Sequence, residues 1–132
     1  MKTKLFFIGL LAVVSMSFTT LLQNSNDWEL LGSRQVDYTL DRDEILVTRL
    51  EGVFTAVKVK VKKGSLNMHS LVLHYGNGEK DEINLKQNFG AESESRVIDL
   101  PGNKRVIQKA VFTYDTKTKS DVKAVVELWG RH

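Results

Sequence analysis

The densest group of chemically capable side chains lies in residues 95–107, SRVIDLPGNKRVI. Arg96, Asp99 and Arg105 flank a Pro-Gly pair, a combination typical of a turn. An arginine guanidinium binds a carboxylate or a phosphate through two parallel hydrogen bonds. The three side chains therefore form either a charged network that orders the turn or a site that holds an anionic group of a ligand. We favour the network, and we keep all three as candidate binding residues.

Trp28 and Trp129 are a second pair of candidate binding residues. They stand in similar runs, WELLGSR and VELWGRH, near the two ends of residues 24–132. Large aromatic rings usually pack in or against a core. Rings exposed on the rim of a β-sandwich can instead stack on sugar rings, as they do in many carbohydrate-binding modules. If the first and last strands are neighbours, the two tryptophans close one side of the sandwich.

Three aspartates are weak candidates for a metal site. Asp37, Asp41 and Asp43 lie close together in the sequence, and alternating carboxylates can bind Ca²⁺. Arg42 stands between two of them, however, and no glycine supplies the sharp turn of a calcium loop. We therefore expect these side chains to bond nearby backbone amides and arginines. We predict no metal and no cofactor.

Two further sets of polar side chains have a predicted orientation. His69 and His74 are five residues apart, which places them on opposite faces of a straight strand unless a bulge intervenes. A basic stripe comprises Lys58, Lys60, Lys62 and Lys63. It could meet a polyanion, but the preferred interpretation is the solvated face of a strand, where lysine also discourages edge pairing.

The motifs of common enzyme classes are missing from the sequence. It has no cysteine, and it contains no G-x-S-x-G, no H-E-x-x-H and no glycine-rich phosphate loop. We therefore predict that the protein is not an enzyme. Carboxylates are plentiful, with 16 Asp and Glu, so a small hydrolase that uses two of them stays open as the least favoured alternative.

Residues 1–23 have the three-part layout of a secretory signal peptide. Lys2 and Lys4 precede an apolar stretch from Leu5 to Phe18, and small and polar residues follow. A stretch of about 14 residues is short for a membrane span, so we predict cleavage and a secreted or periplasmic protein, with an uncleaved anchor as the alternative. Cleavage removes two lysines and lowers the formal net charge from +3 to +1. So small a charge disfavours nucleic acid as a partner.

Residues 24–132 are predicted to form a single all-β domain. Glycines recur every 12 residues, at 52, 64 and 76 and again at 78, 90 and 102, and turn signals at this spacing favour a sandwich or a barrel. Val57, Val59 and Val61 alternate with lysines, which is typical of a strand with one buried and one wet face. We predict an antiparallel two-sheet β-sandwich of about eight strands, for which jelly-roll connections are one option.

Several segments together resemble a family of small exported bacterial proteins that is known only as a domain of unknown function. They are LLGSRQVDYTLDRDEI, GVF at 52–54, YGNGE at 75–79, SRVIDLPGNKRVI at 95–107 and VELWGR at 126–131. The resemblance covers nearly all of residues 28–131, and SRVIDLPG and VELWG are its most specific segments. It implies a β-rich domain outside the cytoplasm, and it implies no catalytic or binding residue.

Taken together, these features predict a non-catalytic secreted or periplasmic binding module for a glycan or another component of the cell envelope. The alternative from a different class is a structural or protein-interaction domain that uses a sheet edge to contact an envelope protein. The mature chain is expected to contain no membrane span. The pattern carries no prediction of oligomeric state.

Overall fold

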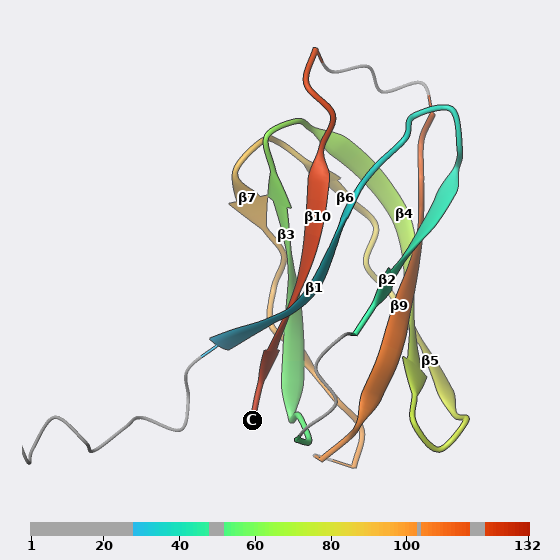
Figure 1. The fold of residues 1–132 in the computed structure, drawn as a ribbon, viewed down its shortest axis with the longest axis vertical. Coiled ribbons are helices and arrows are strands. Elements are labelled where there is room, and N and C mark those ends of the chain that lie inside the picture. Colours follow the sequence, from blue (N-terminus) through green and yellow to red (C-terminus); the bar gives the residue numbers. More distant parts are fainter. Residues whose placement is uncertain (1–27, 48–51, 103, 117–120) are drawn as a thin grey trace, which may run out of the picture.

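The computed structural model describes residues 28–47, 52–102, 104–116 and 121–132, and these residues form ten strands arranged in two antiparallel sheets (Figure 1). Sheet A contains β1 (Trp28–Gln35), β3 (Ala56–Lys62), β7 (Ser93–Glu94), β8 (Ile98–Asp99) and β10 (Val125–Arg131). Sheet B contains β2 (Arg42–Leu46), β4 (Leu66–Tyr75), β5 (Lys80–Ile83), β6 (Gln87–Phe89) and β9 (Ile107–Tyr114). The two sheets face each other across one hydrophobic core, so the predicted β-sandwich is confirmed.

The strand order is that of a jelly roll. Sheet A runs β1-β10-β3-β7, with β8 also paired to β3, and sheet B runs β2-β9-β4-β5, with β6 also paired to β4. The antiparallel pairs are nested, because β1 pairs with β10, β2 with β9, β3 with β7 and β8, and β4 with β5. Two wrapped Greek keys produce this nesting. The first and last described strands are therefore neighbours.

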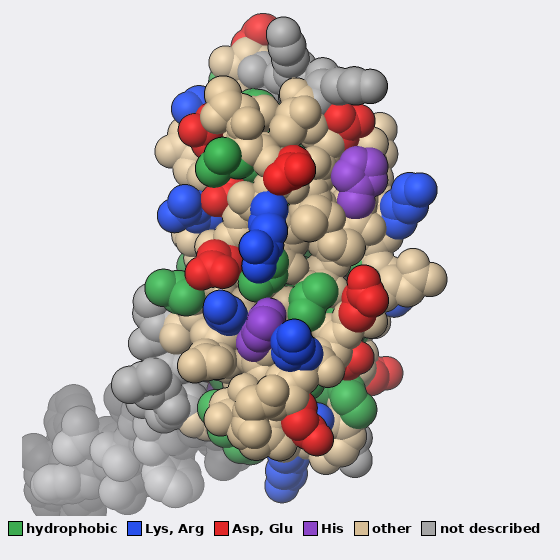
Figure 2. Space-filling view, turned by 90° about the vertical axis from the view of Figure 1, so that its right-hand side faces the viewer, with side chains coloured by type: hydrophobic (Ala, Val, Ile, Leu, Met, Phe, Trp, Pro, Cys, Tyr) green, Lys and Arg blue, Asp and Glu red, His purple; other side chains and the backbone are tan. Residues whose placement is uncertain are grey.

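Alternation along the strands separates a buried face from an outer face in each sheet. In β3, Val57, Val59 and Val61 are buried while the lysines between them point outward, as predicted. In β4 the alternation breaks at a bulge between Met68 and Ser70. The bulge leaves His69 exposed, so the opposite-face arrangement expected for an unbroken strand does not hold. Figure 2, which looks onto the sheet B side, shows side chains of both charges spread over that face.

Tyrosine hydroxyls connect the two sheets at one end of the sandwich. The Tyr38 hydroxyl donates to the backbone oxygen of Ser65 at 2.7 Å and accepts from the amide of Ala124 at 3.2 Å. The Tyr114 hydroxyl lies 2.9 Å from the backbone oxygen of Asp37 and 2.9 Å from Asp43 Oδ2. Buried polar groups that find partners in this way fix how the sheets are placed, because an unpaired group would be costly.

Gly32 on β1 lies close against β2, the edge strand of the other sheet. A Cβ atom at this position would lie 2.6 Å from the backbone oxygen of Leu46 and 2.8 Å from Ile45 Cγ2. We expect Gly32→Ala to lower the free energy of unfolding by about 1–3 kcal/mol, because backbone must shift to admit the methyl group. Urea denaturation would measure it. Gly90→Ala is the matched control, since a Cβ there has nothing within 4 Å and stability should be unchanged or slightly raised. Equal effects of the two changes would contradict the close approach.

The predicted signal peptide, residues 1–23, lies outside the described residues. Within the described part of the chain, no helix has the length and apolar character needed to cross a membrane.

Candidate functional site

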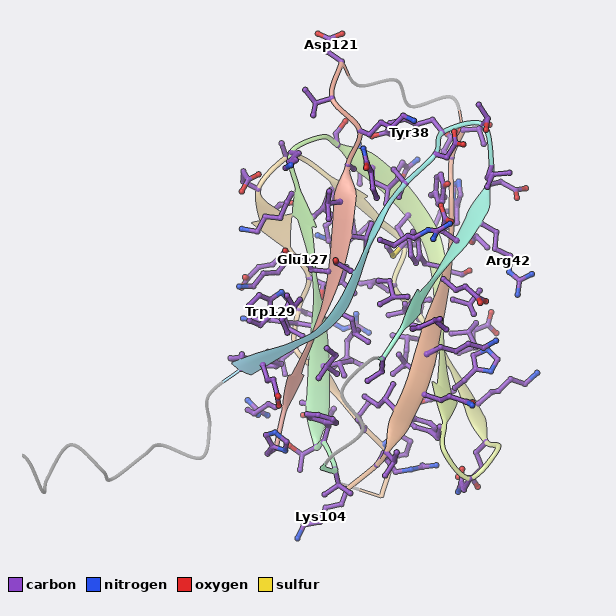
Figure 3. All side chains as sticks on the ribbon, in the orientation of Figure 1. Tyr38, Arg42, Lys104, Asp121, Glu127 and Trp129 are labelled. Atoms are coloured by element: carbon purple, nitrogen blue, oxygen red, sulfur yellow. The ribbon has the colours of Figure 1, made fainter. Side chains whose placement is uncertain are left out.

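The outer face of sheet A brings the two tryptophans together. In the antiparallel register Trp28 lies opposite Arg131, and Leu30 lies opposite Trp129. Trp129 in turn lies opposite Lys58 on β3. Partners directly opposite in an antiparallel pair point to the same face, so both tryptophans lie on the outer face, half-buried. Figure 3 shows Trp129 on this outer side of the sandwich.

Cations cover the tryptophan rings. Lys58 Nζ lies 4.5 Å from the ring centroid of Trp28, and Lys60 Nζ lies 4.3 Å from that of Trp129. The Arg131 guanidinium carbon lies 5.2 Å from the Trp28 centroid. These distances are within the range of cation–π attraction. The two lysine ammonium groups therefore lie over the rings, and both lysine side chains are largely buried, with 13% and 24% of their surface exposed.

Carboxylates balance these cations. Glu94 Oε1 lies 3.5 Å from Lys58 Nζ, and Glu94 Oε2 lies 4.0 Å from Lys60 Nζ. Asp99 lies 3.9 Å from the Arg131 guanidinium, and the indole nitrogen of Trp129 donates to Glu127 at 3.0 Å. We call this surface the sheet A platform. It comprises Trp28, Trp129, Lys58, Lys60, Arg131, Glu94, Glu127 and Asp99.

The platform offers two half-buried indole rings with three cations and three carboxylates around them. Flat apolar rings stack on flat apolar faces of a ligand. The ammonium and guanidinium groups donate hydrogen bonds and the carboxylates accept them. The charges nearly cancel, so the surface suits a ligand rich in hydroxyl groups better than a polyanion.

The candidate residues of the 95–107 run are distributed over different partners. Asp99 joins the platform through Arg131. Arg96 instead donates to the backbone oxygen of Asn84 at 3.3 Å. Arg105 forms an ion pair with Glu79 and donates to the backbone oxygen of Pro101 at 3.2 Å. Each of the two arginines thus binds a separate segment of the fold.

Arg105 is held at the end of the sandwich by Tyr75. Its guanidinium carbon lies 3.8 Å from the Tyr75 ring centroid, and hollows of about 460 and 360 Å³ lie beside the pair. Hydrogen bonds from Asn77 and Arg105, with the charge of Arg105, hold the pKa of Glu79 below its usual value. Burial, with the nearby charge of Asp81, raises the pKa of Tyr75 to about 12. A carboxyl with a lowered pKa is poorly suited to act as a general acid.

The weak metal candidates have structural partners. The Asp37 carboxylate accepts from the amide of Thr39 at 3.1 Å and from its hydroxyl at 2.9 Å, and the backbone bond holds the pKa of Asp37 below its usual value. Asp43 is buried and accepts from Arg34 Nε at 3.0 Å and from Tyr114. Asp41 uses its backbone oxygen to bind the Tyr114 amide. No group of three histidines or carboxylates in the described ranges is arranged to hold a metal ion.

Asp99 and the two lysines of the platform were named from the sequence, but Glu94, Glu127 and Arg131 were missed. Glu127, Trp129 and Arg131 alternate along β10, so their common face was readable from a period of two. No sequence pattern placed Glu94 on this face. It lies on a strand of two residues, which is too short to show alternation, and the pairing of this strand with β3 depends on the path of the preceding loop.

The fold and this face define an all-β jelly-roll domain with an aromatic surface on one sheet. Its sequence matches, over residues 9–130, the model of a family described as a domain of unknown function (DUF2541), and the chain belongs to that family.

Solved structures of other proteins resemble this one to different degrees. Pseudomonas aeruginosa AlgX superposes with a TM-score of 0.53 and 13% sequence identity over 76% of this chain. The chain corresponds to only 26% of the AlgX chain, and this likeness concerns the fold alone. Two mutants of carbohydrate binding modules of family 29 superpose with a TM-score of 0.36 and 12% identity, over 83% of this chain and 82% and 83% of theirs. A TM-score this low supports no conclusion about the fold or the function of this chain. A comparison with curated proteins finds no match.

Proposed function

We propose that this protein is a non-catalytic binding module that acts outside the cytoplasm and binds a glycan on the sheet A platform. The observation that carries the proposal is the meeting of Trp28 and Trp129 on one outer face, although 100 residues separate them in the sequence. A ligand stacks on these half-buried rings by displacing the lysine and arginine side chains that lie over them, whereas a ring enclosed in the core offers a ligand no face. Export is supported by the signal-like segment at residues 1–23.

The charges of the platform favour a glycan over a strongly anionic ligand. Lys58 and Lys60 share Glu94, and Arg131 is paired with Asp99. A polyanion would have to compete with these carboxylates, whereas sugar hydroxyls can both donate to them and accept from the cations. Binding should therefore depend only weakly on salt concentration.

The side chains of the platform also support a binding role rather than catalysis. Glu127 accepts from the Trp129 indole, and Glu94 is shared between two lysines. These two carboxylates are thus engaged by neighbouring side chains of the platform, an arrangement that suits holding a ligand through hydrogen bonds.

Intrinsic fluorescence tests the proposal directly, because Trp28 and Trp129 are the two tryptophans of the chain. We expect a saturable fluorescence change when the protein is titrated with the glycans that bind it on an array. Trp28→Ala and Trp129→Ala should each weaken binding about tenfold, which corresponds to about 1.4 kcal/mol per lost stacking contact. Trp→Phe at either position should retain part of the affinity.

Leu46→Ala is the matched control, since Leu46 is 60% exposed on the edge strand β2 of the other sheet. It should leave glycan binding unchanged. Array binding that is indifferent to both tryptophan changes would refute the proposal. Loss of binding to an envelope protein in Leu46→Ala would favour the edge-interaction alternative, because Leu30 and Leu46 line a groove of about 430 Å³ between the edges of β1 and β2.

A further inference from the structure

Three basic side chains form a row across the outer face of sheet B. His74 on β4 lies directly opposite Lys80 on β5 and directly opposite Lys109 on β9. Residues opposite each other share a face, so the imidazole lies between two ammonium groups. Glu44 compensates the charge of Lys109, because its carboxylate lies 3.6 Å from the ammonium group. Lys80 lies opposite His74 and not opposite a carboxylate, so an anion can be bound at this end of the row.

A shallow pocket of about 240 Å³ adjoins this row. Val72 and Val111 lie opposite each other and form its apolar floor. Arg42 lines the pocket from β2, and Figure 3 shows it pointing away from the sandwich. The pocket is thus bordered by His74 and Lys80 on one side and by Arg42 on the other.

Two hydroxyl groups supply neutral hydrogen-bonding capacity in the same pocket. Ser70 Oγ and Thr113 Oγ1 are 2.6 Å apart, and both residues line the pocket. Thr113 lies opposite Arg42 in the register. A hydroxyl that now donates to its neighbour can turn to donate to an anion instead.

Carboxylates stand beside the pocket but do not neutralise it. Glu44 lies 3.6 Å from Lys109, and Glu82 lies opposite Val72 in the register. Lys80, Lys109 and Arg42 exceed these two carboxylates by one charge, and His74 can add another. Figure 2 shows a histidine between Lys or Arg side chains on this face.

The protonation of His74 reflects these neighbours. Partial burial lowers the pKa of His74, and the charges of Lys109, Lys80 and Arg42 lower it further, while Glu44 acts in the opposite direction. The imidazole is therefore neutral at neutral pH in the free protein. An anion placed beside it would favour the charged form and raise this pKa.

We propose that the outer face of sheet B binds a phosphate group, which is held in this pocket by Lys80, His74 and the guanidinium of Arg42. A phosphate monoester carries a charge of about −1.5 to −2 at neutral pH, so its attraction to several cations exceeds that of a singly charged carboxylate. Lysine acts on phosphate as a point charge and arginine as a bidentate donor. This site lies on the opposite face from the platform, and it does not depend on the glycan-binding proposal.

Histidine NMR tests the phosphate site on the full-length chain. The chain has three histidines, so His69 and His132 serve as internal controls once His74→Gln has assigned the third resonance. We expect methyl phosphate to shift the His74 resonance saturably and to raise its pKa, and acetate at equal ionic strength to do so more weakly. The signals of His69 and His132 should respond equally to both salts.

Single-residue variants distinguish specific phosphate binding from a general effect of ionic strength. Lys80→Ala and Arg42→Ala should each weaken methyl phosphate binding roughly two- to fivefold, the range expected for one solvent-accessible charge contact. Lys80→Ala should also raise the pKa of His74 in the free protein, because a like charge is removed. Lys62→Ala, which lies on the outer face of sheet A, should change neither quantity. The proposal is wrong if chloride or acetate reproduces the phosphate effect, or if both the Lys80 and the Arg42 variants bind as the wild type does.

Discussion

Phe54→Ala is expected to lower the free energy of unfolding by about 3–5 kcal/mol, the cost of removing a buried aromatic ring. Phe54 is 1% exposed, and it joins two segments through paired backbone bonds with Arg105, both 2.9 Å long. Its ring centroid lies 4.5 Å from that of His132. Loss of the ring leaves a cavity at the end of the sandwich where the chain terminus packs.

The surroundings of Phe54 place this cost toward the upper part of that range. A Cβ atom on Gly130 would lie 2.8 Å from Phe54 Cδ1 and 2.8 Å from Leu31 Cδ1. Gly130 has no side chain that could move into the vacated space, so the cavity cannot collapse from that direction. Phe54→Leu should cost less, because it retains most of the volume.

Urea denaturation of Phe54→Ala and of a neighbouring control measures the difference. Val53 is 39% exposed, so Val53→Ala should change stability by no more than about 0.5 kcal/mol. A Phe54→Ala variant within 1 kcal/mol of the Val53→Ala variant would show that Phe54 is not a core residue.

The sequence predicted the architecture because period-two alternation and turn residues act locally. The valines at 57, 59 and 61 define the buried face of β3, and Gly78 and Gly102 adopt the positive φ values, 92° and 81°, that turns need. These features need no knowledge of distant contacts. The pairing of β1 with β10 was considered only as a condition, and no local pattern predicted it.

The parts of the candidate site that were not predicted depend on distant contacts. Arg105 binds Glu79, which is 26 residues away in the sequence, and Arg96 binds the backbone oxygen of Asn84. The turn therefore directs the Arg96 and Arg105 side chains to different segments, although the two residues are close in the sequence. The bulge in β4 changes which residues share a face, although no glycine marks it. Asp43 had a readable signal, since it alternates with Ile45 and Val47, which are buried.

The two outer faces of the sandwich differ in a way that separates their proposed ligands. The sheet A platform is aromatic and balanced in charge, with Glu94 between Lys58 and Lys60. The basic row of sheet B contains no tryptophan and has His74 between two lysines. Binding at the first face should therefore depend little on salt, whereas binding at the second should weaken as salt is added. A single titration series at two salt concentrations would distinguish them.

The stability of the fold is expected to fall as the pH rises above about 10, the ordinary pKa of tyrosine. Burial raises the pKa of Tyr114, and its hydrogen bond to Asp43 and the charge of Asp43 raise it further. Burial and the charge of Asp81 raise the pKa of Tyr75 to about 12. In both cases the folded protein keeps a proton that the unfolded chain has already lost.

The sign and slope follow from this difference in bound protons. Below pH 10 both states keep the proton, so the stabilising contribution of each neutral tyrosine is fully present. Between the unfolded and the folded pKa, each tyrosine lowers the free energy of unfolding by about 1.4 kcal/mol per pH unit. The loss continues until the folded pKa is passed. For Tyr75 this window ends at about pH 12.

Urea denaturation at several pH values between 9 and 12 would measure the slope, and phenylalanine variants would assign it. Tyr75→Phe and Tyr114→Phe should each remove one tyrosine's share of the decline, and the double variant should remove both. Asp81→Asn provides a milder control, because it keeps the Tyr75 ring and removes the charge that raises its pKa. The contribution of Tyr75 to the loss of stability should then be complete at a lower pH. An unchanged slope in the double variant would mean that groups other than these two buried hydroxyls cause the alkaline loss.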